Sequence, residues 1–206
     1  MINKWQAMLQ QVVRLVSRGY VFFNITEYPL KKIDRWEQID NKLKQKYGAV
    51  NLDRFRAYRR NKKGLAKITV IRWNHICVIL HTEGIMPDIE DMDKFSDIRN
   101  ESLILKISEN VIFRISIVNG HVDVRLDREC FMRIKIELQE ICAQKNPPLI
   151  IRDFNRLNGL LPYHGINEQK FLLRDFTVKE ARRHQKKLAK KDLRIYTRMK
   201  SYKAYE

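Results

Sequence analysis

Apolar positions recur along this chain at two spacings, and each spacing predicts a different kind of element. Between residues 2 and 16 apolar side chains return every three or four positions, which is typical of one face of a helix, and Gly19 is placed to end that helix. The same spacing over residues 33–47 predicts a second amphipathic helix. Asp34 stands where a side-chain N-cap would be needed, so we expect it to begin the second helix.

In the middle of the chain the period changes to two. Three short runs with strand composition are separated by polar dipeptides, and they cover residues 103–108, 111–118 and 121–126. Asn119-Gly120 stands between the last two runs, and this dipeptide is the strongest short signal for a β-hairpin. A helix is predicted next, over residues 128–143, with Asp127 as its cap.

Two longer apolar runs predict buried strands, YVFFNIT at 20–26 and GLAKITVIRWNHICVILHTEG at 64–84. Taken as one strand, the second run places His75 and His81 on one face, because alternate residues of a strand share a face. At ~3.3 Å per residue the two rings would lie roughly 20 Å apart, too far for one metal ion to join them. We therefore expect a central core strand and predict no metal site.

Thr177 and Glu180 match a capping box, which predicts that a last helix begins at Thr177. The region before it, 147–176, is interpreted as mixed, with turns at its Pro-Pro and Asn-Gly pairs. The whole pattern indicates an α+β fold, an antiparallel β-meander of about 4–5 strands with flanking helices and a basic C-terminal helix. We expect an α+β domain over 1–176 and a basic helix or tail over 177–206.

The net charge of the chain limits the kinds of partner that it is expected to bind. The 206 residues include 41 Lys and Arg against 24 Asp and Glu, a formal net charge of +17. Solubility alone needs a net charge of roughly 2–8 in a small domain, so the surplus favours a polyanionic partner. No apolar run approaches the ~20 residues that span a bilayer, and the three cysteines form no CxxC pair. We expect a soluble, cytoplasmic protein with reduced cysteines, no cofactor and no membrane partner.

The first candidate binding segment is 54–67, which holds seven Lys or Arg and no acid. Six of its cations are assigned to phosphate contacts, namely Arg54, Arg56, Arg59, Arg60, Lys62 and Lys63. Stacking on a base is assigned to Phe55 or Tyr58. The alternative is a solvated charged strand or arm whose Phe55 and Tyr58 face the core.

The second candidate segment is 178–203, with eleven Lys or Arg against two acids. On a continuous helix its cations would form one positive face, which includes Arg182, Arg183, Lys186, Lys187, Lys190 and Lys191, and Arg194 follows it. Like charges at this spacing repel by ~0.2–0.5 kcal/mol per pair, so an anionic partner would stabilise such a helix. The alternative is a solvated basic tail.

The order of elements resembles that of rolling-circle replication initiators and relaxases of the HUH endonuclease superfamily. YVFFNITEYP at 20–29 is similar to the family's first strand motif, and a basic segment again precedes a strand that carries histidine. The resemblance implies Tyr196, followed by Lys200, as a candidate nucleophile. The family's paired metal-binding histidines, two positions apart, are missing here, because Asn74-His75-Ile76-Cys77 breaks the spacing. The missing histidine pair is consistent with a degenerate member of the family that has lost catalysis and keeps only the binding surface.

These observations predict a non-catalytic nucleic-acid-binding protein, with DNA as the first choice and a plasmid or mobile element as its context. Two alternatives stay open, a metal-dependent DNA strand-cleaving enzyme with Tyr196 as nucleophile and a basic structural subunit of a ribonucleoprotein. Residues 83–101 hold seven acids. We interpret them as a surface loop that docks on the protein's own basic segments or on a protein partner.

Overall fold

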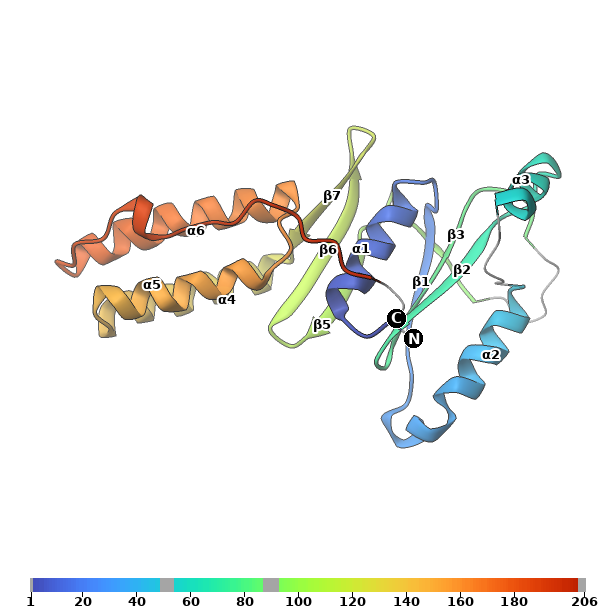
Figure 1. Ribbon diagram of the computed structural model, residues 1–206, viewed down its shortest axis with the longest axis horizontal. Coiled ribbons are helices and arrows are strands. Elements are labelled where there is room, and N and C mark those ends of the chain that lie inside the picture. The colour runs from blue at the N-terminus through green and yellow to red at the C-terminus, as the bar shows by residue number, and fades with distance from the viewer. Residues whose placement is uncertain (1, 49–53, 87–92, 204–206) are drawn as a thin grey trace. The chain divides into compact units, whose positions relative to one another are not determined.

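A computed structural model describes residues 2–48, 54–86 and 93–203 (Figure 1). Contacts within the chain divide it into two compact units. The N-terminal unit comprises residues 1–103, 116–122 and 201–206, and the C-terminal unit comprises 104–115 and 123–200. The fold is mixed α+β with two antiparallel sheets, which confirms the expected class.

In the N-terminal unit, helix α1 (Trp5–Val16) precedes strand β1 (Phe22–Glu27), and a 3-10 turn η1 (Leu30–Arg35) leads into α2 (Trp36–Lys46). The remaining elements of this unit are α3 (Arg54–Lys62), β2 (Ile68–Trp73), β3 (Ile76–His81) and β4 (Ser96–Asp97). Within the described residues the strands form a four-stranded sheet in the order β2-β3-β1-β4. Gly19 ends α1 at φ +85°, as the sequence predicts.

The run over 64–84 is a β-hairpin, so the expected single strand is wrong. Trp73 pairs with Ile76, which leaves Asn74 and His75 as a two-residue turn. Asn74 adopts φ +50°, a left-handed conformation that asparagine tolerates better than most residues. His75 therefore lies in the turn, and His81 ends β3.

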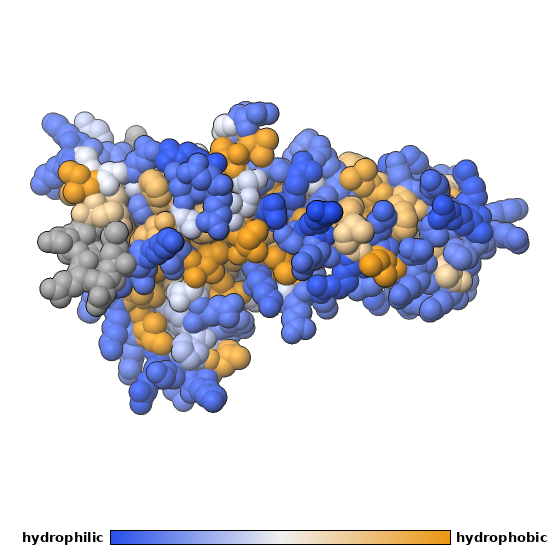
Figure 2. Space-filling model, turned by 180° about the vertical axis from the view of Figure 1, so that it is seen from behind, coloured by the Kyte–Doolittle hydropathy of each residue, from blue (hydrophilic) through white to orange (hydrophobic). Residues whose placement is uncertain are grey.

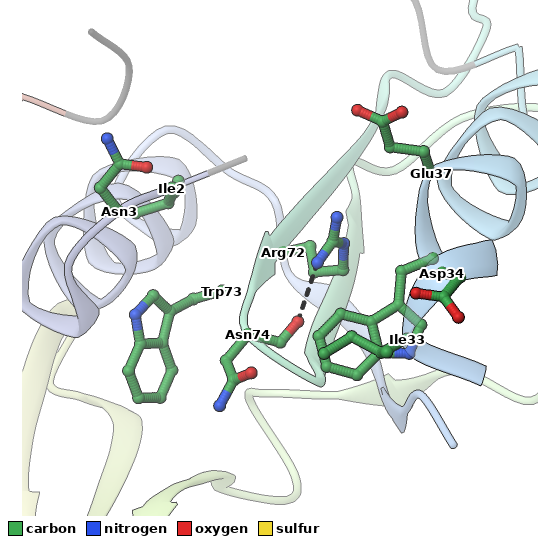
Figure 3. A pocket seen from close by; sticks show the side chains of 9 residues that line it. Ile2, Asn3, Ile33, Asp34, Glu37, Arg72, Trp73 and Asn74 are labelled. Atoms are coloured by element: carbon green, nitrogen blue, oxygen red, sulfur yellow. Dashed lines mark hydrogen bonds between the residues drawn. The ribbon is translucent and has the colours of Figure 1, made fainter. Parts of the chain in front are cut away.

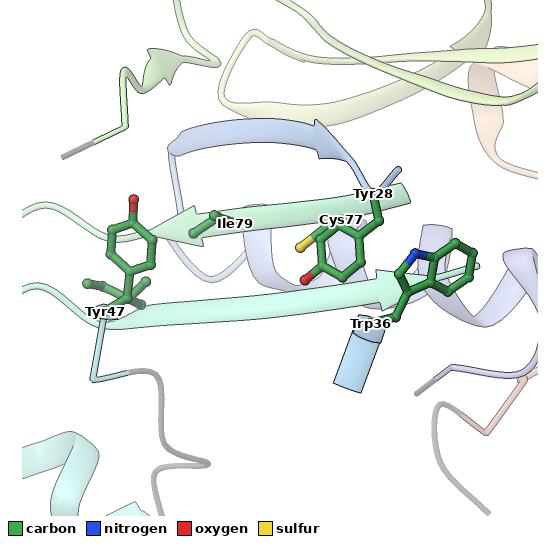
Figure 4. Close-up of a cluster of buried hydrophobic side chains, with 6 residues drawn as sticks. Tyr28, Trp36, Tyr47, Cys77 and Ile79 are labelled. Atoms are coloured by element: carbon green, nitrogen blue, oxygen red, sulfur yellow. The ribbon is translucent and has the colours of Figure 1, made fainter. Parts of the chain in front are cut away.

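Strand β3 is the centre of this unit. It pairs with β2 on one side and β1 on the other, and all six of its residues are buried. Cys77 and Ile79 pack into a cluster with Tyr28 and Trp36 (Figure 4). The prediction of a buried core strand is thus confirmed for β3.

Helix α2 begins without the predicted cap. Its N-cap position is Arg35, and no side chain accepts a hydrogen bond there, so the assignment of Asp34 is wrong. The chain enters α2 directly from η1, whose own turn occupies Asp34. The corresponding prediction for Asp127 is confirmed, since its carboxylate accepts from the backbone N–H of Glu129 at 3.1 Å.

The elements after residue 102 are β5 (Leu103–Ser108), β6 (Val111–Val118), β7 (His121–Leu126), α4 (Arg128–Gln144), α5 (Pro147–Asn155), η2 (Arg156–Gly159), α6 (His164–Arg183) and η3 (Lys190–Asp192). Within the described residues β5, β6 and β7 form the second sheet in sequence order. All three strands match their predicted ranges, and Asn119-Gly120 forms the expected turn with both residues at positive φ.

The predicted start of the last helix is wrong. Helix α6 begins at His164, so the region expected to be mixed contains α5 and the first part of α6. Thr177 lies in the middle of α6, fully buried, and its hydroxyl donates to the Leu173 carbonyl at 2.7 Å. A threonine inside a helix can make this bond to the preceding turn instead of capping, so the capping-box pattern was misleading.

Helix α6 is attached to β7 by two residues one turn apart. The side-chain amide of Gln169 accepts from the N–H of Leu126 at 2.8 Å and donates to its carbonyl at 3.0 Å. Gly165 allows the close approach, because a Cβ there would lie 2.8 Å from the Val124 carbonyl oxygen. The buried amide thus supplies the hydrogen bonds that a neighbouring strand would make.

A separate core joins the helices of the C-terminal unit. Leu138 of α4, Phe154 of α5 and Leu173 of α6 meet the buried Leu193, which follows η3. Four apolar residues of α4 recur at helical spacing, and all contact this core or the cluster beside it, namely Phe131, Ile134, Leu138 and Ile141. The chain after α6 is therefore packed on the helices.

Candidate nucleic-acid interface

The basic segment 54–67 forms helix α3 and its connection to β2. Gly64 ends the helix at φ +66°, and the N–H of Leu65 donates back to the Arg60 carbonyl at 3.0 Å. This is the glycine-based C-terminal motif that closes many helices. Ala66 and Gly64 then exchange backbone hydrogen bonds with Ile85, so the end of α3 is fixed to the chain that follows β3.

One face of α3 carries two aromatic and two cationic side chains in solvent. Phe55, Tyr58, Arg59 and Lys62 are spaced i, i+3, i+4 and i+7, which places them on one side of a helix. Phe55 is 73% exposed and Tyr58 is 67% exposed. These exposures exclude the alternative in which both rings face the core.

The other predicted residues of this segment differ in their surroundings. Lys63 is exposed, whereas Arg60 turns toward the protein and donates to the Ala66 carbonyl at 3.1 Å. The Nε of Arg60 is buried without a hydrogen-bond partner among the described residues. Arg54 and Arg56 begin α3, and their side chains lie outside the described part of the chain. Arg60 thus supports the end of α3.

The predicted positive helix face in the C-terminal segment is not formed. Helix α6 ends at Arg183, because Gln185 adopts φ +57° and the N–H of Lys186 donates to the Ala181 carbonyl at 2.9 Å. This is the same closing motif as in α3, with glutamine in the position that glycine usually takes. Residues 187–203 form no α-helix or strand and contain only the short η3, so the 3–4 spacing of their cations does not place them on one helix face.

Several of these cations make contacts within the C-terminal unit. Lys186 donates to the carbonyls of Cys142 and Ala143 at the end of α4, where a cation is favoured by the helix dipole. Lys190 pairs with Asp175 at 2.9 Å. Arg183 pairs with Glu180 at 3.1 Å. Exposed positions among the predicted set are Arg182, Arg183, Lys187, Lys190, Lys191 and Arg194.

The two predicted segments belong to different units, α3 to the N-terminal unit and 182–194 to the C-terminal unit. Each is therefore a separate candidate surface. The face of the molecule in Figure 2 is covered mainly by hydrophilic side chains, in keeping with the net charge of +17. Of the two candidate segments, α3 is the one whose described residues combine cations with largely exposed aromatic rings on a helix face.

Tyr196 lies after η3 in a segment without helical structure, where its N–H donates to the Asn158 side chain at 2.9 Å. Its ring is 62% exposed. The helix expected to carry this tyrosine is therefore absent from residues 184–203, apart from the short η3. The described residues bring no three His, Cys, Asp or Glu side chains together as a metal site.

The histidine at the end of β3 belongs to an aromatic cluster. The ring of His81 stacks on Phe22 at 4.7 Å between centroids and meets the edge of Phe95 at 4.6 Å. Burial lowers the pKa of His81, so the ring is neutral at pH 7. This histidine is therefore a packing residue and contributes no positive charge to binding.

Part of the acidic segment 83–101 is described, and residues 87–92 lie outside the description. Arg99 pairs with Glu83 at 2.6 Å and with Asp97 at 2.7 Å. Asp93 pairs with Lys46 at 3.3 Å. These acids thus have cationic partners inside the N-terminal unit, and a protein partner for the segment stays a prediction.

The sequence patterns did not indicate a buried polar cluster between α2 and the sheet. Arg72 of β2 donates through Nε and Nη2 to Asp40 of α2, at 2.8 Å in each case, and the Tyr28 hydroxyl donates to the same carboxylate at 2.9 Å. Burial raises the pKa of Cys77 to about 12 and also raises the pKa of Tyr28. Both groups therefore stay protonated at neutral pH, and the cluster holds α2 in place without supplying a nucleophile.

No protein-family model, curated protein or solved structure matches this chain. Within the described residues, no helix has the length and apolar character needed to cross a bilayer.

Proposed function

We propose that this protein binds nucleic acid through the exposed face of α3. The supporting observation is that Phe55 and Tyr58 are largely exposed beside Arg59 and Lys62 on one helix face. Aromatic rings stack on unpaired bases of any sequence, and neighbouring cations neutralise the backbone phosphates. This combination favours single-stranded over duplex nucleic acid, because the bases of a duplex are already stacked.

DNA is our first choice of ligand, in a plasmid or mobile-element context, because of the resemblance to rolling-circle initiators. The C-terminal unit would offer phosphate contacts on a separate surface, through exposed cations that include Arg182, Lys187, Lys191 and Arg194. Phosphate contacts are alike in DNA and RNA, so the choice between them is decided by the binding experiment.

The test is a titration of labelled single-stranded and duplex oligonucleotides, followed by fluorescence anisotropy. Phe55→Ala and Tyr58→Ala should each weaken single-strand binding by roughly 5- to 150-fold, since stacking contributes ~1–3 kcal/mol per base. Tyr196→Ala is the matched control, because Tyr196 is about as exposed as Tyr58. The affinity of the Tyr196→Ala variant for the single strand should stay within twofold of that of wild type.

Unchanged affinity in both α3 variants would overturn the proposal. Tighter binding of RNA than of DNA would favour the ribonucleoprotein subunit. The strand-cleaving alternative is tested in the same samples with Mn²⁺ added. A covalent adduct that disappears in Tyr196→Phe would establish it.

A further inference from the structure

The N-terminal unit contains a cavity of about 650 Å³ that the sequence patterns did not indicate (Figure 3). It lies where the residues before α1, the junction of η1 with α2, and the β2–β3 turn come together. Its lining residues are Ile2, Asn3, Ile33, Asp34, Trp36, Glu37, Arg72, Trp73 and Asn74. A volume of this size accommodates a small molecule or one projecting group of a larger ligand.

Two indole rings form part of the wall. Trp36 is 7% exposed, and its Nε1 donates to the Pro29 carbonyl at 3.1 Å, which fixes the ring. Trp73, at the end of β2, is half-buried. Ile2 and Ile33 add aliphatic surface. The wall therefore favours a flat apolar group that can contact rings and methyl groups together.

The polar groups of the wall exclude an anion. Asp34 and Glu37 are exposed carboxylates at the cavity, and Asn3 and Asn74 supply neutral amides. The guanidinium of Arg72 is already engaged by Asp40 and by the Asn74 carbonyl, at 3.0 Å to the latter. A phosphate would thus meet two negative charges, whereas N–H donors on a neutral heterocycle would find carboxylate and amide acceptors.

We propose that this cavity binds one unpaired nucleobase, an inference that rests on the proposed function. A base has a flat π-face for the indoles and N–H donors at its edge for the carboxylates and amides. Its phosphates would stay outside, where Lys4, Lys32 and Arg35 adjoin the lining residues in sequence and are exposed. The cavity would then recognise a single base, and α3 would bind the rest of the single strand.

The cavity and α3 lie at opposite ends of β2. The strand follows α3 in sequence and ends at Trp73, and its six residues span roughly 20 Å. An oligonucleotide must therefore be several nucleotides long to use both sites. A free nucleoside can occupy the cavity alone, which allows the two sites to be tested separately.

The test is equilibrium dialysis of the full chain in 0.5 M salt against labelled adenosine and cytidine. Argininamide, a cation that the carboxylates of the cavity wall would attract, is the competing probe. High salt suppresses phosphate-dependent binding but leaves a neutral nucleoside unaffected. We expect saturable binding of at least one nucleoside. Trp73→Leu should weaken it roughly 5- to 150-fold, the range set by ~1–3 kcal/mol of stacking.

Two further variants complete the design. Asn74→Gly removes a lining amide but keeps a residue that accepts the positive φ of the turn, so it should weaken binding while the hairpin stays intact. Tyr196→Ala removes an exposed ring of the C-terminal unit and should leave nucleoside binding unchanged.

Absence of saturable nucleoside binding, or binding of argininamide in its place, would overturn the base site. Equal binding in wild type, Trp73→Leu and Asn74→Gly would do the same. If nucleosides fail to bind but oligonucleotides still bind through α3, the proposed function stands without this site. If nucleosides bind but the α3 variants leave oligonucleotide affinity unchanged, the base site stands and the α3 surface does not.

Discussion

The salt dependence of binding offers the sharpest test of α3 as a phosphate-binding surface. The perturbation is the triple variant Arg59→Gln, Lys62→Gln, Lys63→Gln, which removes three exposed cations from the helix and its C-terminal end. All three side chains lie on the surface, so the fold of the N-terminal unit should be unaffected.

The magnitude follows from counterion release. Each phosphate that a cation neutralises on a single strand contributes about −0.7 to the slope of log K against log salt concentration. Loss of three contacts should therefore make the slope less negative by about 2. Between 50 and 200 mM salt, wild type should then lose roughly 15-fold more affinity than the variant.

The assay is anisotropy of a labelled single strand over that range of salt. The matched control is Lys44→Gln, Lys106→Gln, Arg128→Gln, which removes the same charge from exposed positions of other elements. Its slope should change by less than 0.7, the share of a single contact. An equal change of slope in both triple variants would refute the reasoning, because the net charge of the whole protein would then account for binding.

Two further predictions concern the C-terminal unit. Gly165→Ala should lower the free energy of unfolding, measured by urea denaturation, by ~1–3 kcal/mol, because the added Cβ would lie 2.8 Å from the Val124 carbonyl oxygen. Gly159→Ala is the control and should be neutral or slightly stabilising, because its Cβ would have no atom within 4 Å. Lys170 is buried, and desolvation lowers its pKa to about 8, so the unfolded chain binds more protons than the folded one above that pH. The unfolding free energy of wild type relative to Lys170→Met should therefore rise between pH 8 and 10, and a constant difference would contradict the assignment.

Local sequence patterns correctly predicted those elements that are formed mainly by contacts between residues close in sequence. The strands 103–108, 111–118 and 121–126 follow from alternation and from the Asn-Gly turn, whose two residues accept positive φ. The cap of α4 follows from Asp127 and the helical spacing after it. In each case the signal and the structure lie within one element or one turn, so a single sequence contains enough information.

The hairpin at β2–β3 shows where a local pattern is insufficient. All residues of β3 are buried and those of β2 are buried or half-buried, so the apolar run continues up to the turn and resumes directly after it. The turn itself is marked only by Asn74, whose left-handed conformation has no glycine beside it. Pairing of β3 with β1 helps to decide the structure, and the residues of that pair are distant in sequence.

The candidate site, too, could be predicted from the sequence only in part. Composition identified 54–67 as basic and aromatic, but the spacing of Phe55, Tyr58, Arg59 and Lys62 is equally typical of a helix face that packs on a core. Only the tertiary structure shows that this face is exposed. The cavity wall is assembled from three segments whose residues carry no common motif. Functional surfaces of this kind become visible only when burial is known, because the chemistry of a ring or a cation depends on whether solvent or protein surrounds it.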